Sequence, residues 1–145
     1  MDAASCENDE YKVVVYDHLQ DDVKHIREEV FMKEQGFENE FDDLDAISTF
    51  VVIYDDQAMA TGRFYPSGDS YVIGRVAVLK PYRNQGLGKL VIHSLEEEIQ
   101  RINGKYIELS AQQRVQSFYE NLGYTRVGDV YYDEHCPHVK MIKEV

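Results

Sequence analysis

The chain of 145 residues contains no tryptophan, three prolines and only two cysteines. Cys6 and Cys136 lie near opposite ends and form no Cys-x-x-Cys pair, which argues against a disulfide framework. The apolar runs, such as Val13–Tyr16 and Phe50–Tyr54, are too short to span a bilayer, and the amino end lacks the basic and apolar regions of a signal peptide. We therefore expect a cytoplasmic protein without a membrane span.

Positive charge is also scarce, because 15 Lys and Arg residues stand against 27 Asp and Glu residues, for a formal net charge of −12. Non-specific affinity for nucleic acids and anionic membranes comes from basic side chains that meet phosphates, so neither is expected as a partner. Hydrophobic residues make up 43% of the chain, enough for a packed core. We expect a single folded domain over residues 1–145, with a flexible lead over residues 1–10.

Hydrophobic periodicity predicts strands and helices in an irregular order. The predicted strands cover residues 11–16, 49–54, 59–65, 71–79, 106–110, 125–132 and 139–142, and the predicted helices cover 19–34, 87–102 and 115–122. This is an α+β order with one βαβ crossover, in which the strands at 71–79 and 106–110 become parallel neighbours. Ligands favour the carboxyl ends of parallel strands, so we expect a site at that edge.

A glycine-containing connection, Gly74–Gly88, joins the strand of this crossover to the long helix. The free N–H groups and the positive dipole end of a helix amino terminus suit a phosphate, and glycine permits its close approach. The segment fits neither a P-loop, which needs Ser or Thr after Gly-Lys, nor the G-x-G-x-x-G fingerprint, so a plain turn before the helix is the alternative. Its local positive charge comes from Lys80, Arg83 and Lys89.

The apolar run Val76–Val78, followed by Arg83–Gly88 (Arg-Asn-Gln-Gly-Leu-Gly), resembles motif A of the GNAT N-acetyltransferase superfamily. Gln112–Tyr124 resembles the second signature of that family, Asn-x-x-Ala-x-x-Leu/Phe-Tyr-x-x-x-Gly-Phe/Tyr. Ile26–Gln35 and Pro137–Met141 resemble a bacterial subgroup often called ElaA-like. The resemblance implies an α+β fold with a GNAT-like mixed, mostly antiparallel sheet, splayed between strands 4 and 5 and flanked by helices.

The resemblance implies acetyl-CoA as co-substrate and no metal. Backbone groups of Val76, Ala77 and Val78 would pair with the pantetheine arm like an added strand. The backbone amides of the next loop would hold the pyrophosphate, through Arg83, Asn84, Gln85, Gly86, Leu87 and Gly88. Lys89 is either a further charge near a phosphate or a solvated side chain, and Gln112 replaces the more usual asparagine of the family.

The resemblance assigns the general acid to Tyr119, whose hydroxyl would protonate the departing CoA thiolate. The alternative is that Tyr119 is simply a core residue of an amphipathic helix. A backbone N–H near Val78 is expected to stabilise the oxyanion. The first candidate for the general base is Glu34, followed by the acidic residues Asp42 and Asp45, for which a solvated loop is the favoured interpretation.

His138 is a candidate base, an acceptor contact or a structural hydrogen-bonding residue. Arg27 is expected to pair with Glu34 across the helix or to bind an acidic group of the acceptor. No metal site is expected, because the potential ligands crowd into one predicted turn and no second cluster occurs in the sequence. These potential ligands are Asp133, His135, Cys136 and His138.

Together these features predict an enzyme that moves an acetyl group from acetyl-CoA to a primary amine by direct attack in a ternary complex. A catalytically silent, acyl-CoA-binding regulatory module is the alternative, and transfer of a longer acyl group stays open. The acceptor would be a small-molecule or peptide amine, and the acidic composition weakly favours a cationic one. A homodimer, for which Tyr131 and Tyr132 could supply an interface, also stays open.

Overall fold

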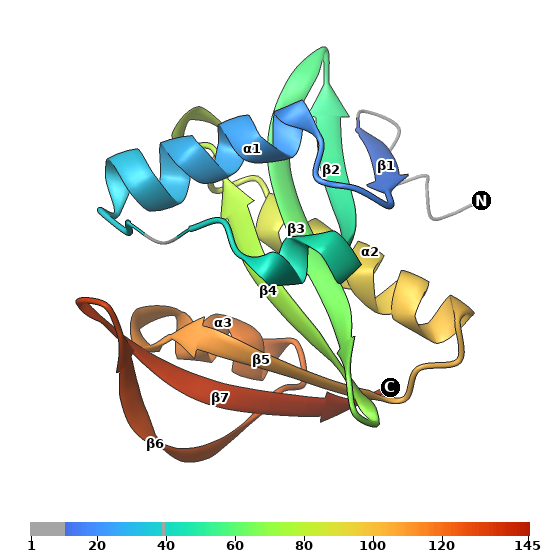
Figure 1. Cartoon of the computed structure of the whole chain (residues 1–145), viewed down its shortest axis with the longest axis vertical. Coiled ribbons are helices and arrows are strands. Elements are labelled where there is room, and N and C mark those ends of the chain that lie inside the picture. Colours follow the sequence, from blue (N-terminus) through green and yellow to red (C-terminus); the bar gives the residue numbers. More distant parts are fainter. Residues whose placement is uncertain (1–10, 39) are drawn as a thin grey trace.

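The computed structural model describes residues 11–38 and 40–145, so the predicted flexible lead and Cys6 lie outside the described residues (Figure 1). The described strands form one seven-stranded sheet in the order β1-β2-β3-β4-β5-β7-β6. Neighbouring strands are antiparallel except for the parallel pair β4 and β5, which confirms the predicted mixed, mostly antiparallel α+β sheet. The strands are β1 (Lys12–Tyr16), β2 (Thr49–Asp55), β3 (Gln57–Ser67), β4 (Ser70–Val78), β5 (Tyr106–Gln112), β6 (Thr125–Asp133) and β7 (Cys136–Glu144).

Helices cover both faces of the sheet. In Figure 1, α1 crosses in front of β3 and β4, whereas α2 lies behind β2, β3 and β4. Each side has its own apolar core, with Val23, Ile26 and Phe50 on the α1 side and Val91 and Leu95 on the α2 side. The helical elements are α1 (Asp21–Arg27), η2 (Glu28–Glu34), η3 (Asp43–Ile47), η4 (Lys80–Tyr82), α2 (Leu87–Arg101), η5 (Gln113–Val115) and α3 (Gln116–Asn121).

The first helix departs from the sequence prediction. One regular helix is predicted over residues 19–34, but only α1 is α-helical and η2 is a π-helix. At its end, the N–H of Gln35 donates to the carbonyl of Val30, five residues earlier, at 3.1 Å. A π-turn redirects the side chains that follow it and often marks a functional site. Here Phe31 and Gln35 face a cavity at the centre of the sheet.

The strands β4 and β5 separate toward their carboxyl ends. Their pairing ends at Ile73 and Leu109, although β4 continues to Val78 and β5 to Gln112. The backbone of β4 beyond Ile73 therefore has no strand partner on its β5 side. This opening is the predicted splay between strands 4 and 5, at the carboxyl edge where ligands are expected.

A β-bulge in β4 borders the opening. The register between β3 and β4 shifts so that Gly62 stands opposite both Arg75 and Val76. Arg75 has a φ of 53°, in the left-handed region that residues other than glycine rarely adopt. Gly62 also permits close packing of α2, because a Cβ at this position would lie 2.6 Å from Cγ1 of Val91.

Two further predictions concern surfaces. Among the described residues, no helix is both long and apolar enough to cross a membrane. On the edge strand β6, Tyr131 and Tyr132 are 41% and 70% exposed. Their exposure does not test the homodimer, which stays a prediction.

Candidate active site

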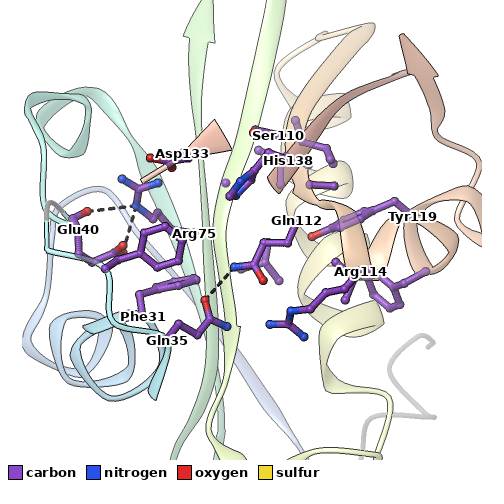
Figure 2. Close-up of a pocket in the computed structure, with 18 of the residues that line it drawn as sticks. Phe31, Gln35, Glu40, Arg75, Ser110, Gln112, Arg114, Tyr119, Asp133 and His138 are labelled. Carbon is purple, nitrogen blue, oxygen red and sulfur yellow. Dashed lines mark hydrogen bonds and ion pairs between the residues drawn. The ribbon is translucent and has the colours of Figure 1, made fainter. Parts of the chain in front are cut away.

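A cavity of about 450 Å³ fills the opening between β4 and β5 (Figure 2). Its walls come from those two strands, from the end of η2, from the loop before α2, from α3 and from the hairpin between β6 and β7. The fold therefore brings together predicted site residues from distant parts of the chain. Those that line the cavity are Val76, Arg83, Asn84, Gln112, Tyr119 and His138.

The loop before α2 presents free backbone N–H groups. Within the described part of the chain, none of the N–H groups from Asn84 to Lys89 donates a hydrogen bond, and the first helical bond runs from Leu90 to Gly86 at 3.1 Å. Asn84 and Gly86 adopt φ values of 66° and 80°, which form the tight turn into the helix. Free amides at the positive end of a 15-residue helix suit a phosphate group.

Gly88 lies where α2 meets α3. A Cβ at this position would meet the ring of Phe118 at 3.4 Å, so the glycine keeps the two elements close. The side chain of Lys89 is exposed and that of Gln85 accepts a hydrogen bond from the hydroxyl of Tyr11 at 3.1 Å. The first turn of α2 therefore offers its backbone N–H groups to an anion, whereas a contact of Lys89 with a phosphate stays a prediction.

Arg83, which lines the cavity, is held by an ion pair. Its two terminal nitrogens each donate to Glu34 at 2.7 Å, and its Nε donates to the carbonyl of Val78 at 2.9 Å. The hydrogen bonds from Arg83 lower the pKa of the Glu34 carboxyl. A carboxylate with both oxygens engaged and a lowered pKa is a weak base, so these contacts argue against the expected base function of Glu34.

Arg27 corrects a second expectation. Its side chain is fully buried, and it donates to Glu40 and to Asp45, each at 2.8 Å, rather than to Glu34 or to an acceptor. A buried guanidinium needs such partners, because an uncompensated buried charge is very costly. Arg27 therefore anchors the segment between η2 and β2 to the protein.

That segment is also not the solvated loop expected from its acidic run. Arg63 pairs with Asp42 at 2.8 Å and with Asp45 at 2.6 Å, and Arg75 bridges Glu40 at 3.0 Å and Asp42 at 3.2 Å. The hydrogen bond from Arg63 lowers the pKa of Asp42, whereas burial raises the pKa of Glu40. We call the six residues Arg27, Glu40, Asp42, Asp45, Arg63 and Arg75 the arginine–carboxylate cluster.

Tyr119 is buried but reaches the cavity. Burial raises the pKa of its phenol to about 12, so the hydroxyl keeps its proton at neutral pH. Among the described residues, no group forms a hydrogen bond with this hydroxyl, which points into the cavity (Figure 2). Edge-on contacts with Phe118 and Tyr124, at 5.0 and 5.9 Å between ring centroids, fix the ring. Tyr119 is thus both a packed residue and an available proton donor.

The imidazole of His138 has a defined orientation. Its Nδ1 lies 2.9 Å from the carbonyl oxygen of Cys136. A carbonyl only accepts, so Nδ1 carries the proton and Nε2 of the neutral ring has a free lone pair. The ring stacks on Tyr131 at 6.1 Å and meets Phe37 edge-on at 6.4 Å. This residue is therefore a fixed proton acceptor in the cavity wall.

Gln112, at the end of β5, donates through Nε2 to Oε1 of Gln35 at 2.8 Å. The longer side chain that replaces the family's asparagine thus spans the gap between β5 and η2. Of the other predicted cofactor contacts, Ala77 is buried on the α1 side of the sheet, while Val76 and Val78 pack toward the α2 side.

Sequence reasoning missed several residues of the cavity wall. Arg75 directly precedes the apolar run of motif A, but nothing in the local pattern indicates its bulge. Phe31 and Phe37 read as ordinary apolar residues. The described residues contain no group of three or more His, Cys, Asp and Glu side chains placed to hold a metal ion, and Cys136 is a free thiol. The missed residues include Phe31, Gln35, Phe37, Glu40, Arg75, Ser110 and Arg114, whereas the sequence indicates Asp133 only as a potential metal ligand.

Comparison with known proteins shows the family of the chain. The sequence profile of the acetyltransferase (GNAT) domain matches residues 9–145. The splayed sheet and the loop before α2 indicate the same class of protein as this profile. The chain belongs to the GNAT family of acyl-CoA N-acyltransferases.

Particular relatives are similar over most of their length. The Bacillus subtilis protein YyaT is 33% identical over 126 residues, which is 83% of this chain and 85% of the relative. An acyl-CoA N-acyltransferase from Pseudomonas aeruginosa superposes with a TM-score of 0.84 at 26% identity, over 92% of this chain and 99% of the other. Escherichia coli ElaA superposes with a TM-score of 0.80 at 26% identity, over 93% and 99% of the two chains. The predicted kinship with ElaA is thus confirmed.

Proposed function

We propose that this protein transfers an acetyl group from acetyl-CoA to a primary amine by direct attack in a ternary complex. The proposal depends on one observation: a turn with free backbone amides, a protonated phenol and a fixed imidazole all border the same cavity. The turn supplies the free amides of the loop before α2, the phenol is Tyr119 and the imidazole is His138.

The residues of the opening fit an acyl-CoA. The β4 backbone beyond Ile73 has no strand partner toward β5, so Val76–Val78 offers groups to which a pantetheine arm can add like a strand. The amides of Asn84–Lys89 suit the pyrophosphate that such an arm carries. Arg114 lines the same half of the cavity and adds positive charge there. Acetyl-CoA would supply the activated acyl carbon, held at the centre of the opening.

Two side chains then handle the protons. Nε2 of His138 accepts the proton that the amine loses as its nitrogen bonds to the acyl carbon, and a backbone N–H near Val78 stabilises the oxyanion. When the carbon–sulfur bond breaks, the hydroxyl of Tyr119 gives its proton to the thiolate. Cys136 is not among the residues that line this cavity, which favours direct attack over an acetylated cysteine.

Thermal unfolding tests the cofactor half. Acetyl-CoA, free CoA, ATP and NADH are added separately, and a ligand at about 100 times its dissociation constant should stabilise the folded state by about 2.7 kcal/mol. We expect stabilisation by acetyl-CoA and CoA, and none by ATP or NADH. No shift with either CoA compound would refute the proposed function.

The variant Tyr119→Phe tests the chemistry. It keeps the ring and removes the proton donor, so thiol release from acetyl-CoA with an amine should fall about a hundredfold, with CoA affinity unchanged. Tyr106→Phe is the matched control, because Tyr106 is 48% exposed at the start of β5. Binding of CoA without turnover on any amine would instead indicate the catalytically silent regulatory module.

A further inference from the structure

The two halves of the cavity differ in their charges. On the cofactor half, Arg83 is paired with Glu34 and Arg114 adds a positive charge. On the other half, Glu40, Arg75 and Asp133 lie together across the cavity from Tyr119 and Arg114 (Figure 2). An acceptor entering opposite the cofactor therefore meets this second group of charges.

Most of these charges are already balanced. The arginine–carboxylate cluster contains three arginines and three carboxylates, so its formal charges sum to zero. Arg75 belongs to it, with its guanidinium held between Glu40 and Asp42. Asp133 is outside the cluster, and its carboxylate has no ion pair or hydrogen bond with the described residues. The acceptor half therefore carries one uncompensated negative charge, on Asp133.

The β6–β7 hairpin fixes the relation between Asp133 and His138. Asp133 pairs with Cys136 in the register of the hairpin, and His138 is two residues further along β7. Such diagonal neighbours on one sheet face lie about 7–8 Å apart. The tip of the hairpin is itself anchored, because the ring of His135 packs on Phe37 at 5.1 Å between centroids. The backbone positions of Asp133 and His138 thus have a set spacing on one face of the hairpin.

We propose that Asp133 selects a dicationic acceptor, an α,ω-diamine whose second ammonium it binds while the first amine reaches His138. This inference rests on the proposed function and names its substrate class. A chain of four or five carbons, at roughly 1.3 Å per bond, separates two nitrogens by about 6–8 Å and matches the diagonal spacing. The rings of Phe31 and Phe37, which contact each other edge-on at 6.5 Å, offer an apolar wall for the methylene stem.

The test compares three acceptors with five carbons each: 1,5-diaminopentane, n-pentylamine and 5-aminopentanoate. We expect the wild-type kcat/KM to be highest for the diamine and lowest for the amino acid. In Asp133→Asn, kcat/KM for the diamine should fall about tenfold, mainly through KM, because an ammonium loses an exposed carboxylate partner. The value for n-pentylamine should stay within about twofold.

Asp129→Asn is the matched control, since Asp129 is an exposed carboxylate on the same strand and is absent from the cavity wall. A second readout is salt: added NaCl should raise KM for the diamine in the wild type and leave it nearly constant in Asp133→Asn.

Three results would overturn this inference alone. Two of them are equal wild-type kcat/KM values for the diamine and the monoamine, and equal losses of kcat/KM for both in Asp133→Asn. Either would show that Asp133 does not bind a second ammonium group. Preference for 5-aminopentanoate would instead assign recognition to Arg75. In each of these cases amine acetylation itself persists, so the proposed function stands. No transfer to any amine, with CoA still bound, would refute both.

Discussion

Arg83 and Glu34 join the loop before α2 to the end of η2 through two hydrogen bonds of 2.7 Å each. The next residue, Gln35, accepts a hydrogen bond from Gln112 at 2.8 Å. Two consecutive positions at the end of the π-helix therefore contact two residues that the family resemblance assigns to the cofactor. Arg83, Gln35 and Gln112 all line the cavity, so an acyl-CoA bound there as proposed would meet these contacts, and its binding would be linked to the position of η2.

The variant Glu34→Gln separates this structural function from catalysis. The pair is about one-third exposed on both sides, so its loss should cost less than about 1 kcal/mol of unfolding free energy. We expect kcat to stay within about threefold of the wild type, because a carboxylate engaged by Arg83 is a weak base. Steady-state thiol release checks this, with Glu29→Gln, from an exposed pair on the same π-helix, as control. A hundredfold loss of kcat in Glu34→Gln alone would return the base function to Glu34.

His138→Gln should lower kcat/KM about a hundredfold, because Nε2 of His138 is the proposed proton acceptor. Acetyl-CoA should still stabilise the variant against heat, since this residue lies away from the loop before α2. His93→Gln, an exposed histidine on α2, should behave as the wild type. If His138→Gln retained full activity while folding normally, the imidazole would be only a structural group.

Local patterns in the sequence predict most of the elements, and they mark the turn before α2. Alternating and helical periodicities mark the strands and helices, and the order of elements requires the parallel pair of β4 and β5. The turn from Arg83 to Gly88 can be recognised in the sequence because its signal is local. It consists of glycines and the start of a helix directly after a strand.

Long-range partners are what the sequence leaves undecided. Asp42 and Asp45 look like part of a solvated acidic run until Arg63 and Arg75, on β3 and β4, are seen beside them. A helical stripe likewise cannot distinguish α1 from η2, because the added residue of a π-turn changes the facing of later side chains without a clear mark in composition. The bulge at Arg75 depends on its pairing with Gly62, so the local sequence does not indicate it either.

Gly62→Ala tests the packing that supports the bulge. The added Cβ would lie 2.6 Å from Cγ1 of Val91 and 2.9 Å from Cδ1 of Leu95, so α2 has to shift. Overpacking of this kind should lower the unfolding free energy by about 2 kcal/mol, measured by urea unfolding. Gly74→Ala is the control for stability, because a Cβ at Gly74 meets no atom within 4 Å. Equal stability of the two variants would contradict the close contact.

The arginine–carboxylate cluster should make the fold sensitive to acid. Hydrogen bonds and charges from arginines lower the pKa of both Asp42 and Asp45 below the ordinary 3.8, although burial acts in the opposite direction. The stability that these two groups contribute is therefore complete above about pH 4 and is lost as the pH falls through their folded-state pKa values. Glu40, whose pKa is raised by burial, has the opposite sign and offsets part of this loss.

Asp45→Asn isolates the contribution of one carboxylate. At pH 7 the variant should be less stable by about 3 kcal/mol, because Arg27 is fully buried and loses one of its two charged partners. Its unfolding free energy should also fall less steeply than that of the wild type below pH 4, since one of the two acid-sensitive groups is gone. Asp43→Asn, an exposed neighbour, should match the wild type in both respects. Urea unfolding from pH 7 to pH 3 measures both quantities, and an unchanged acid slope in Asp45→Asn would show that the cluster is not the origin of the acid sensitivity.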